Sequence, residues 1–140
     1  MTRRNGYLSD EPTSRRMSAV RPLDTTPEKV VRSLVTAMGG RYRLHRHDLP
    51  GRPDLVFVRA RKVILVHGCF WHRHMGCKRC TTPARNAGLW REKFARTVER
   101  DERNLAALAG LGWRVLVVWE CETADAQALR SRLAEFLGEG

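Results

Sequence analysis

A chain of 140 residues with 42% hydrophobic content has enough apolar material for one ordinary core and little for a second, so a single domain is expected. No stretch approaches the roughly 20 consecutive apolar residues of a membrane-spanning helix, and the N-terminus lacks the apolar segment of a secretory signal. We therefore expect a monomeric cytoplasmic protein without membrane contacts. Its four cysteines favour reduced thiols or a bound metal over disulfides.

The 26 basic and 15 acidic side chains give a formal net charge of +11, and the excess lies in the middle of the chain. Residues 41–62 and 72–100 are strongly basic, whereas residues 101–140 are acidic on balance. This distribution favours a polyanion such as DNA, because each basic side chain that meets a phosphate releases counterions. On charge alone, a solvated surface, ribosomal RNA or an acidic protein remain alternatives.

Residues 1–24 contain two Arg-Arg pairs and two prolines but no apolar periodicity, which predicts a basic N-terminal arm before a single domain at 25–140. A helix is predicted over residues 27–38. Thr26 would be its N-cap, a proline follows at the first helical position, and two glycines after Met38 would end it.

Three short strands are predicted next, around residues 42–44, 55–58 and 63–66. A cysteine-rich loop separates them from a long helix over residues 89–108 with an apolar stripe. An apolar strand from Trp113 to Trp119, whose two tryptophans are expected in the core, precedes a last helix over residues 123–137. This order predicts an α/β fold in which helices flank a mixed sheet.

The loop from Cys69 to Cys80 concentrates metal-ligating side chains. Three cysteines and two histidines lie within twelve residues, and Cys121 lies downstream. Thiolates and imidazoles are the ligands that tetrahedral zinc prefers, and a loop with so little apolar material would need a metal to hold it. The spacing leaves the choice of ligands open, and Cys121 could instead be a buried thiol.

A candidate catalytic group surrounds Asp54, which follows a tight turn and begins a strand. A carboxylate there could bind Mg²⁺, which prefers oxygen ligands and can bridge to a scissile phosphate, although Pro-Asp in a turn is common. His67 and His72 flank the cysteine-rich loop, and a histidine held by a carboxylate is a competent general base. Glu28 opens a helix that could pack beside them.

Three aromatic residues stand near the candidate metal ligands. Phe70 and Trp71 lie in the loop, and Trp90 begins the next helix, where core packing is the default interpretation. Apolar side chains on a rigid loop can wedge between base steps of DNA. Two further histidines, His45 and His47, alternate on a basic strand and are expected to be surface or structural residues.

Five motifs closely resemble those of the very-short-patch repair (Vsr) endonucleases: Leu-Pro-Gly-Arg-Pro-Asp (49–54), His-Gly-Cys-Phe-Trp-His-x-His (67–74), Trp-x-x-Lys (90–93), Val-Glu-Arg-Asp (98–101) and Leu-Gly-Trp-Arg-Val-Leu-Val-Val-Trp-Glu-Cys (111–121). The resemblance runs from about Arg15 to the end. It implies a restriction-endonuclease-like core and Mg²⁺-dependent hydrolysis of one strand of double-stranded DNA, 5′ to the T of a T:G mismatch. It also implies a place at the bacterial nucleoid, with mismatch-repair proteins as candidate partners.

The resemblance implies roles for individual residues by position. Mg²⁺ would be bound by Asp54 and by the backbone of Val66. His67 and His72 would serve the water and phosphate chemistry, with Glu28 orienting His72. Structural Zn²⁺ would be bound by Cys69, His74, Cys77 and Cys121. DNA would be contacted by Met17, Phe70, Trp71, Trp90, Lys93 and Thr97, with the three aromatic side chains intercalating from the major groove and Met17 entering from the minor groove.

The chain departs from the family pattern at a few positions. Val66 stands in place of Thr, which matters little if only its backbone meets the metal. Thr97 stands in place of an Asn, which leaves the mismatch preference open. One residue is inserted between His74 and Cys77, and Cys80 is a spare thiol that could replace a ligand.

Two other functions remain alternatives. The same core could serve a restriction or homing-type nuclease that cuts intact duplexes. A non-catalytic zinc module that only binds bent or damaged DNA would need the cysteines and the basic charge but not Asp54.

Overall fold

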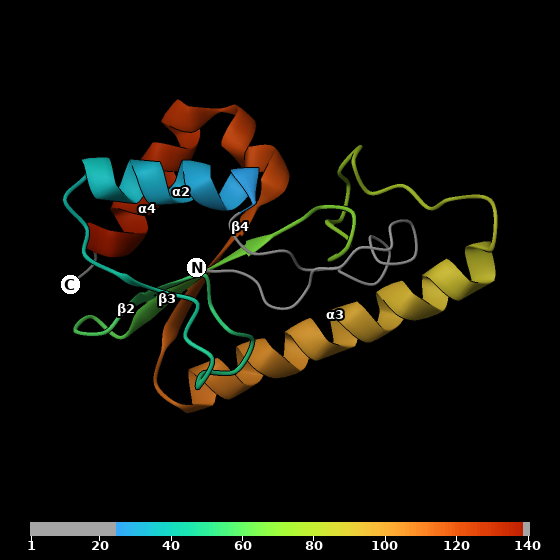
Figure 1. Ribbon diagram of the computed structural model, residues 1–140, viewed down its shortest axis with the longest axis horizontal. Helices are drawn as coiled ribbons and strands as arrows, with labels where there is room; N and C mark the ends of the chain where they lie inside the picture. Colours follow the sequence, from blue (N-terminus) through green and yellow to red (C-terminus); the bar gives the residue numbers. More distant parts are fainter. Residues whose placement is uncertain (1–24, 139–140) are drawn as a thin grey trace, which may run out of the picture.

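The computed structural model describes residues 25–138, so the predicted arm at 1–24, including Met17, lies outside the described residues. The elements follow in the order α2 (Thr26–Ala37), β1 (Arg43–Leu44), β2 (Leu55–Phe57), β3 (Lys62–His67), α3 (Ala87–Gly110), β4 (Arg114–Trp119), the 3-10 helix η1 (Glu120–Ala124) and α4 (Ala126–Gly138). A long loop that carries three of the cysteines joins β3 to α3 (Figure 1).

The four strands form one sheet in the order β1-β2-β3-β4. The pairs β1–β2 and β2–β3 are antiparallel, whereas β3 and β4 are parallel, with His67 opposite Trp119 at their carboxyl ends. Helix α3 lies between these two strands in the chain and makes the crossover that a parallel pair requires. The expected α/β fold with a mixed sheet is therefore confirmed.

The helices cover opposite faces of the sheet (Figure 1). On one face, Val35 of α2 and Leu133 of α4 share a core cluster with Leu55 of β2. On the other face, Leu108 near the end of α3 packs with Val63 of β3. Because successive side chains of a strand point to opposite faces, the continuously apolar strands supply both clusters.

Helix α2 begins one residue earlier than predicted, because Thr25 and not Thr26 is its N-cap. The Thr25 side chain accepts a hydrogen bond from the Glu28 amide at 3.4 Å. Pro27 then occupies the first turn, where its missing N–H costs nothing. The cap fixes Glu28, which is only 3% exposed, in the first turn of the helix.

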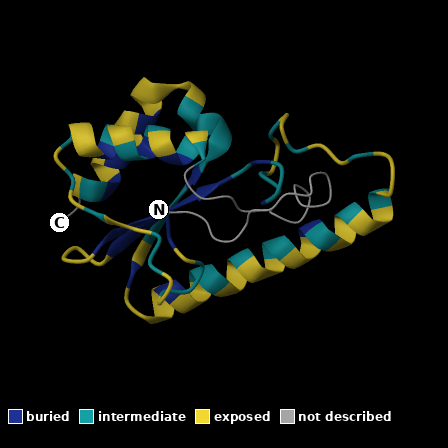
Figure 2. Cartoon of the chain, in the orientation of Figure 1, coloured by how far each residue is buried: buried dark blue, intermediate teal, exposed yellow. Residues whose placement is uncertain are grey.

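Helix α3 is 24 residues long, with only Phe94 and Leu108 buried. Figure 2 shows exposed residues along most of its length. The helix starts at Ala87, just after Asn86, whose backbone is left-handed. None of the helices in the described part of the chain has the length and apolar character to span a bilayer.

The single last helix predicted for residues 123–137 is two elements in the structure. The 3-10 helix η1 ends at Ala124, and α4 begins at Ala126. Asp125 separates them, since its carboxylate accepts a hydrogen bond from the Ala128 amide at 3.1 Å in the manner of an N-cap. The tight turn of η1 holds Cys121 directly after the end of β4.

Candidate active site and metal centre

The candidate site forms where β3 and β4 end. These strands are parallel and in register from Lys62 and Arg114 onward, so their carboxyl ends lie at the same edge of the sheet. His67 ends β3 and Trp119 ends β4. The loop after β3 and the turn after β4 therefore meet there.

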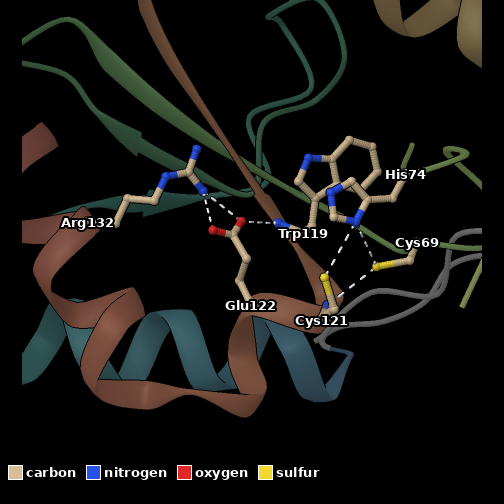
Figure 3. A network of polar contacts seen from close by, with 6 residues as sticks. All are labelled: Cys69, His74, Trp119, Cys121, Glu122 and Arg132. Atoms are coloured by element: carbon tan, nitrogen blue, oxygen red, sulfur yellow. Dashed lines mark hydrogen bonds and ion pairs between the residues drawn. The ribbon is translucent and has the colours of Figure 1, made fainter. Parts of the chain in front are cut away.

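Four metal-ligating side chains come together beside this edge. The ligand atoms of Cys69, His74, Cys77 and Cys121 all lie within 4.8 Å of one another. The His74 Nδ1 atom is 3.6 Å from the Cys69 Sγ atom and 3.4 Å from the Cys121 Sγ atom (Figure 3). These four are the residues that the family resemblance implies, and Cys80 is outside the group. Three thiols and one imidazole could hold a metal ion.

The protonation of the thiols depends on their surroundings. Burial raises the pKa of the Cys69 thiol to about 12 and also raises the pKa of Cys121. The backbone hydrogen bond from Arg79 lowers the pKa of Cys77. Because only a thiolate binds a metal, a cation entering this group has to displace protons from Cys69 and Cys121.

Residues at the end of β4 and in η1 hold the cysteine-rich loop in place. The His74 ring stacks on Trp119, with ring centroids 4.3 Å apart and planes 8° apart. The Cys69 amide donates a hydrogen bond to the Glu120 carboxylate at 3.3 Å. The Trp119 amide donates one to Glu122 at 2.8 Å, and Arg132 pairs with the same carboxylate (Figure 3). The loop is therefore anchored on β4 and η1.

A second group consists of two stacked imidazoles and a carboxylate. The rings of His67 and His72 lie 3.9 Å apart with planes 7° apart, and both residues are buried. The His72 Nδ1 atom is 2.6 Å from the Asp101 Oδ2 atom of α3. The predicted pairing of His72 with Glu28 is therefore wrong: the carboxylate that orients this ring comes from α3, which crosses the face where the loop lies.

A third group contains Glu28, His45 and Asp54, whose ligand atoms also lie within 4.8 Å of one another. The His45 Nε2 atom is 3.1 Å from the Glu28 Oε1 atom, and its side chain is 14% exposed. Of the two histidines expected to be surface or structural residues, His47 is exposed, whereas the His45 ring turns inward to Glu28.

Asp54 itself is 2% exposed and lies against β3. Its carboxylate accepts a hydrogen bond from the Val66 amide at 2.6 Å, while a metal contact through the Val66 carbonyl oxygen stays a prediction. The Asp54 amide donates a hydrogen bond to the Ile64 carbonyl oxygen at 3.0 Å. Ile64 is also the partner of Leu55, so two successive residues meet it where the β2–β3 pairing begins, as in a β-bulge.

The aromatic residues of the loop and of α3 form one cluster. Phe70 contacts Trp71 at 5.1 Å, Trp90 at 5.8 Å and Phe94 at 5.1 Å between ring centroids. Only Phe94 is buried, and the other three are half-buried. The cluster thus presents part of its apolar surface to the outside.

Basic side chains border this aromatic cluster. The Arg73 guanidinium lies 3.8 Å from the centre of the Phe94 ring, and the Lys93 Nζ atom lies 5.5 Å from the centre of the Trp71 ring. Thr97 lies one turn after Lys93 and bonds to its carbonyl oxygen at 3.1 Å. The structure therefore brings together the aromatic residues, Lys93 and Thr97 that the resemblance implied for DNA contacts.

Two residues of the site were missed by the sequence reasoning. Asp101 received no role from the sequence, although it ends the motif Val-Glu-Arg-Asp at 98–101. His45 carried no sequence signal, since its inward position depends on a left-handed backbone with a φ of 47°.

The fold is that of a restriction or homing endonuclease. The catalytic domain of homing endonuclease I-Bth0305I superposes with a TM-score of 0.57 and 21% sequence identity, over 81% of this chain and 94% of that domain. At this identity the similarity concerns the fold alone.

Sequence comparison defines the family. The profile described as DNA mismatch endonuclease Vsr matches residues 7–79. A type II nicking enzyme of Xanthomonas oryzae pv. oryzae is 50% identical over 93% of this chain and 95% of its own length. The DNA mismatch endonuclease Vsr of Escherichia coli is 45% identical over 91% of this chain and 85% of its own length. The chain belongs to the Vsr family of DNA mismatch endonucleases.

Proposed function

We propose that this protein is a strand-specific nicking enzyme that hydrolyses double-stranded DNA 5′ to the T of a T:G mismatch. The observation that supports this most directly is the buried, carboxylate-held imidazole pair of His67 and His72. It lies at the end of β3, the strand whose Val66 amide bonds to Asp54. The relatives named DNA mismatch endonuclease and type II nicking enzyme share most of the chain.

In this proposal, His72 takes the proton of the attacking water. Asp101 bonds to its Nδ1 atom at 2.6 Å, which fixes the orientation of the ring and leaves Nε2 to accept the proton. The resulting imidazolium is stabilised by the same carboxylate. His67, stacked on His72, would donate a hydrogen bond to the phosphate.

Two metal ions fit the side chains present. Asp54, with the Val66 carbonyl oxygen, would hold Mg²⁺, because this cation prefers oxygen ligands. When bound, Mg²⁺ would offset the charge that develops on the scissile phosphate. Zn²⁺ fits the group of Cys69, His74, Cys77 and Cys121, where it would be structural, since three thiolates and one imidazole complete a tetrahedron.

The aromatic cluster is the proposed contact with the mismatch. Phe70, Trp71 and Trp90 are half-buried side chains that a kinked duplex could receive between its base steps. Lys93, over the Trp71 ring, would approach the mismatched bases, and Thr97 would follow it along α3. In the same proposal Met17 enters the minor groove, and the protein acts as a monomer with mismatch-repair proteins as further partners.

Incubation with Mg²⁺ and end-labelled duplexes tests the proposal. The duplexes carry the mismatch in a panel of sequence contexts. In at least one context, the T:G duplex should be nicked in the T strand, and the matched C:G duplex should stay intact. The Asp54→Ala variant should lose nicking by at least about a hundredfold and keep its metal at the cysteines. Inertness on every T:G duplex would refute the proposal. Equal cutting of T:G and C:G duplexes would support a restriction-type enzyme, and binding without cleavage a non-catalytic module.

A further inference from the structure

Three segments far apart in the chain converge on the group of Glu28, His45 and Asp54. Glu28 lies in the first turn of α2, His45 directly follows β1, and Asp54 directly precedes β2. Their ligand atoms lie within 4.8 Å of one another. Together the three segments offer two carboxylates and one imidazole nitrogen.

The two carboxylates are buried close together. Glu28 is 3% exposed and Asp54 is 2% exposed. Like charges that are held near one another away from water repel strongly, and a cation between them removes that repulsion. The Thr25 cap bonds to the backbone amide of Glu28 in the first turn of α2, and the Glu28 carboxylate contacts the His45 ring.

The spacing of the ligand atoms also suits a metal. The His45 Nε2 atom and the Glu28 Oε1 atom are 3.1 Å apart. Two neighbouring ligands of an octahedral ion, each bound at about 2.1 Å and at right angles, are about 3.0 Å apart. A cation could therefore enter between these atoms without a large movement of either side chain.

The backbone directs His45 toward the carboxylates. His45 has a φ of 47°, a left-handed conformation that is uncommon for residues other than glycine. Its amide donates a hydrogen bond to the Asp54 carbonyl oxygen at 3.3 Å. This bond ties the two ligand-bearing segments together at the edge of the sheet.

We propose that His45 is a direct ligand of the divalent cation held by Asp54, with Glu28 as a further ligand. This inference rests on the proposed function, which requires that cation. Imidazole binds first-row transition ions better than it binds Mg²⁺. The site of this chain should therefore prefer Mn²⁺ over Mg²⁺ more strongly than a site with oxygen ligands alone.

Pulsed electron paramagnetic resonance of bound Mn²⁺ tests the proposal without DNA. The probe is Mn²⁺ added to the full chain with its cysteine site filled by Zn²⁺. The wild type should show coupling to a directly bound imidazole ¹⁴N. His45→Gln, which keeps a hydrogen-bonding amide, should lose this coupling and bind Mn²⁺ about tenfold more weakly. His47→Gln, an exposed histidine in the same segment, should behave as the wild type.

Several results would overturn the inference. The first is a wild type that does not bind Mn²⁺, and the second is a wild type that binds Mn²⁺ without ¹⁴N coupling. The third is coupling that persists in His45→Gln, because the coupled nitrogen would then belong to another histidine ring. If that variant fails to fold, the wild type still gives an answer: substoichiometric Mn²⁺ should broaden the His45 ring signals in NMR spectra far more than those of His47, and equal broadening would refute the proposal.

The nicking assay is independent of this experiment. Nicking of T:G duplexes by a protein without ¹⁴N coupling would overturn the role of His45 alone. Coupling in a protein that never nicks DNA would overturn the proposed function alone.

Discussion

His72, in the cysteine-rich loop, contacts Asp101 of helix α3. The two atoms are 2.6 Å apart, and the side chains are 5% and 18% exposed. A carboxylate in this position selects one tautomer of the ring and makes its other nitrogen a better base. In the proposed mechanism, Asp101 acts through His72 as a positioning residue.

Replacement of Asp101 tests this role. Asp101→Asn should lower the single-turnover nicking rate by on the order of a hundredfold or more, because the amide favours the wrong tautomer. Affinity for the duplex should change by no more than about twofold, since no DNA contact is removed. Glu102→Gln, an exposed acid on the same helix, is the matched control. Equal losses of rate in the two variants would contradict the assignment.

The half-buried tryptophans make a prediction about mismatch preference. Trp71→Ala should lower the affinity for a T:G duplex by on the order of tenfold, because a stacked base step loses its apolar partner. The affinity for a matched duplex should change little. Leu89→Ala, which removes an exposed side chain beside Trp90, is the control. Competition binding with both duplexes measures the ratio, and an unchanged ratio in Trp71→Ala would exclude the wedge role.

At the scale of elements, the central ones could be predicted from the sequence. Helix α2 and strands β2, β3 and β4 fall within two residues of their predicted bounds, because apolar periodicity directly reports which face is buried. The break between η1 and α4 could not be predicted, because apolar spacing continues through Asp125. Its effect depends on a side chain to backbone bond.

The polar contacts of the site were harder to predict from the sequence. Motif resemblance named the four residues of the cysteine and histidine group, since they lie in or beside two long motifs. The partner of His72 depends on how α3 crosses the sheet, and the position of His45 depends on one left-handed residue. Both features depend on the tertiary structure, so no local sequence pattern predicts them.

Trp119 links the metal-ligating loop to the proposed chemistry. Its ring stacks on His74 at 4.3 Å and meets the edge of the His67 ring, with centroids 5.3 Å apart. If the loop loses its structure, Trp119 should lose its support from His74, and the position of the His67 ring should become less well defined.

Removal of a cysteine tests this link. Cys121→Ser should lose one equivalent of bound metal, lower the melting temperature by at least about 5 °C, and reduce nicking. Cys80→Ser should keep the metal and the activity, because this thiol is outside the group. Metal analysis with thermal unfolding measures both, and loss of metal in Cys80→Ser would instead make Cys80 a ligand.

The raised thiol pKa values predict how metal binding depends on pH. The pKa of Cys69 is raised to about 12 and that of Cys121 is also raised, both by burial, so these thiols are protonated at neutral pH without a metal. Binding then releases their protons, and the affinity should fall at least about tenfold for each unit by which the pH is lowered. Competition with a chelator between pH 6 and 8 measures this slope. An affinity independent of pH would contradict the thiol assignment.

On the scale of the whole molecule, both faces of the sheet carry a core cluster, and the proposed chemistry lies at the carboxyl ends of β3 and β4. One face carries the core shared by α2 and α4, while the aromatic cluster and the stacked imidazoles lie between the cysteine-rich loop and α3. The formal charge of +11 attracts DNA without choosing a site on it. Choice of the strand must then come from the cluster and the residues beside it.

Mapping of the cleavage position at single-nucleotide resolution tests the central claim most directly. With each strand of a T:G duplex labelled in turn, we expect one nick, immediately 5′ to the mismatched T, and an intact G strand. Cuts in both strands, or the same cut in a matched C:G duplex, would contradict it.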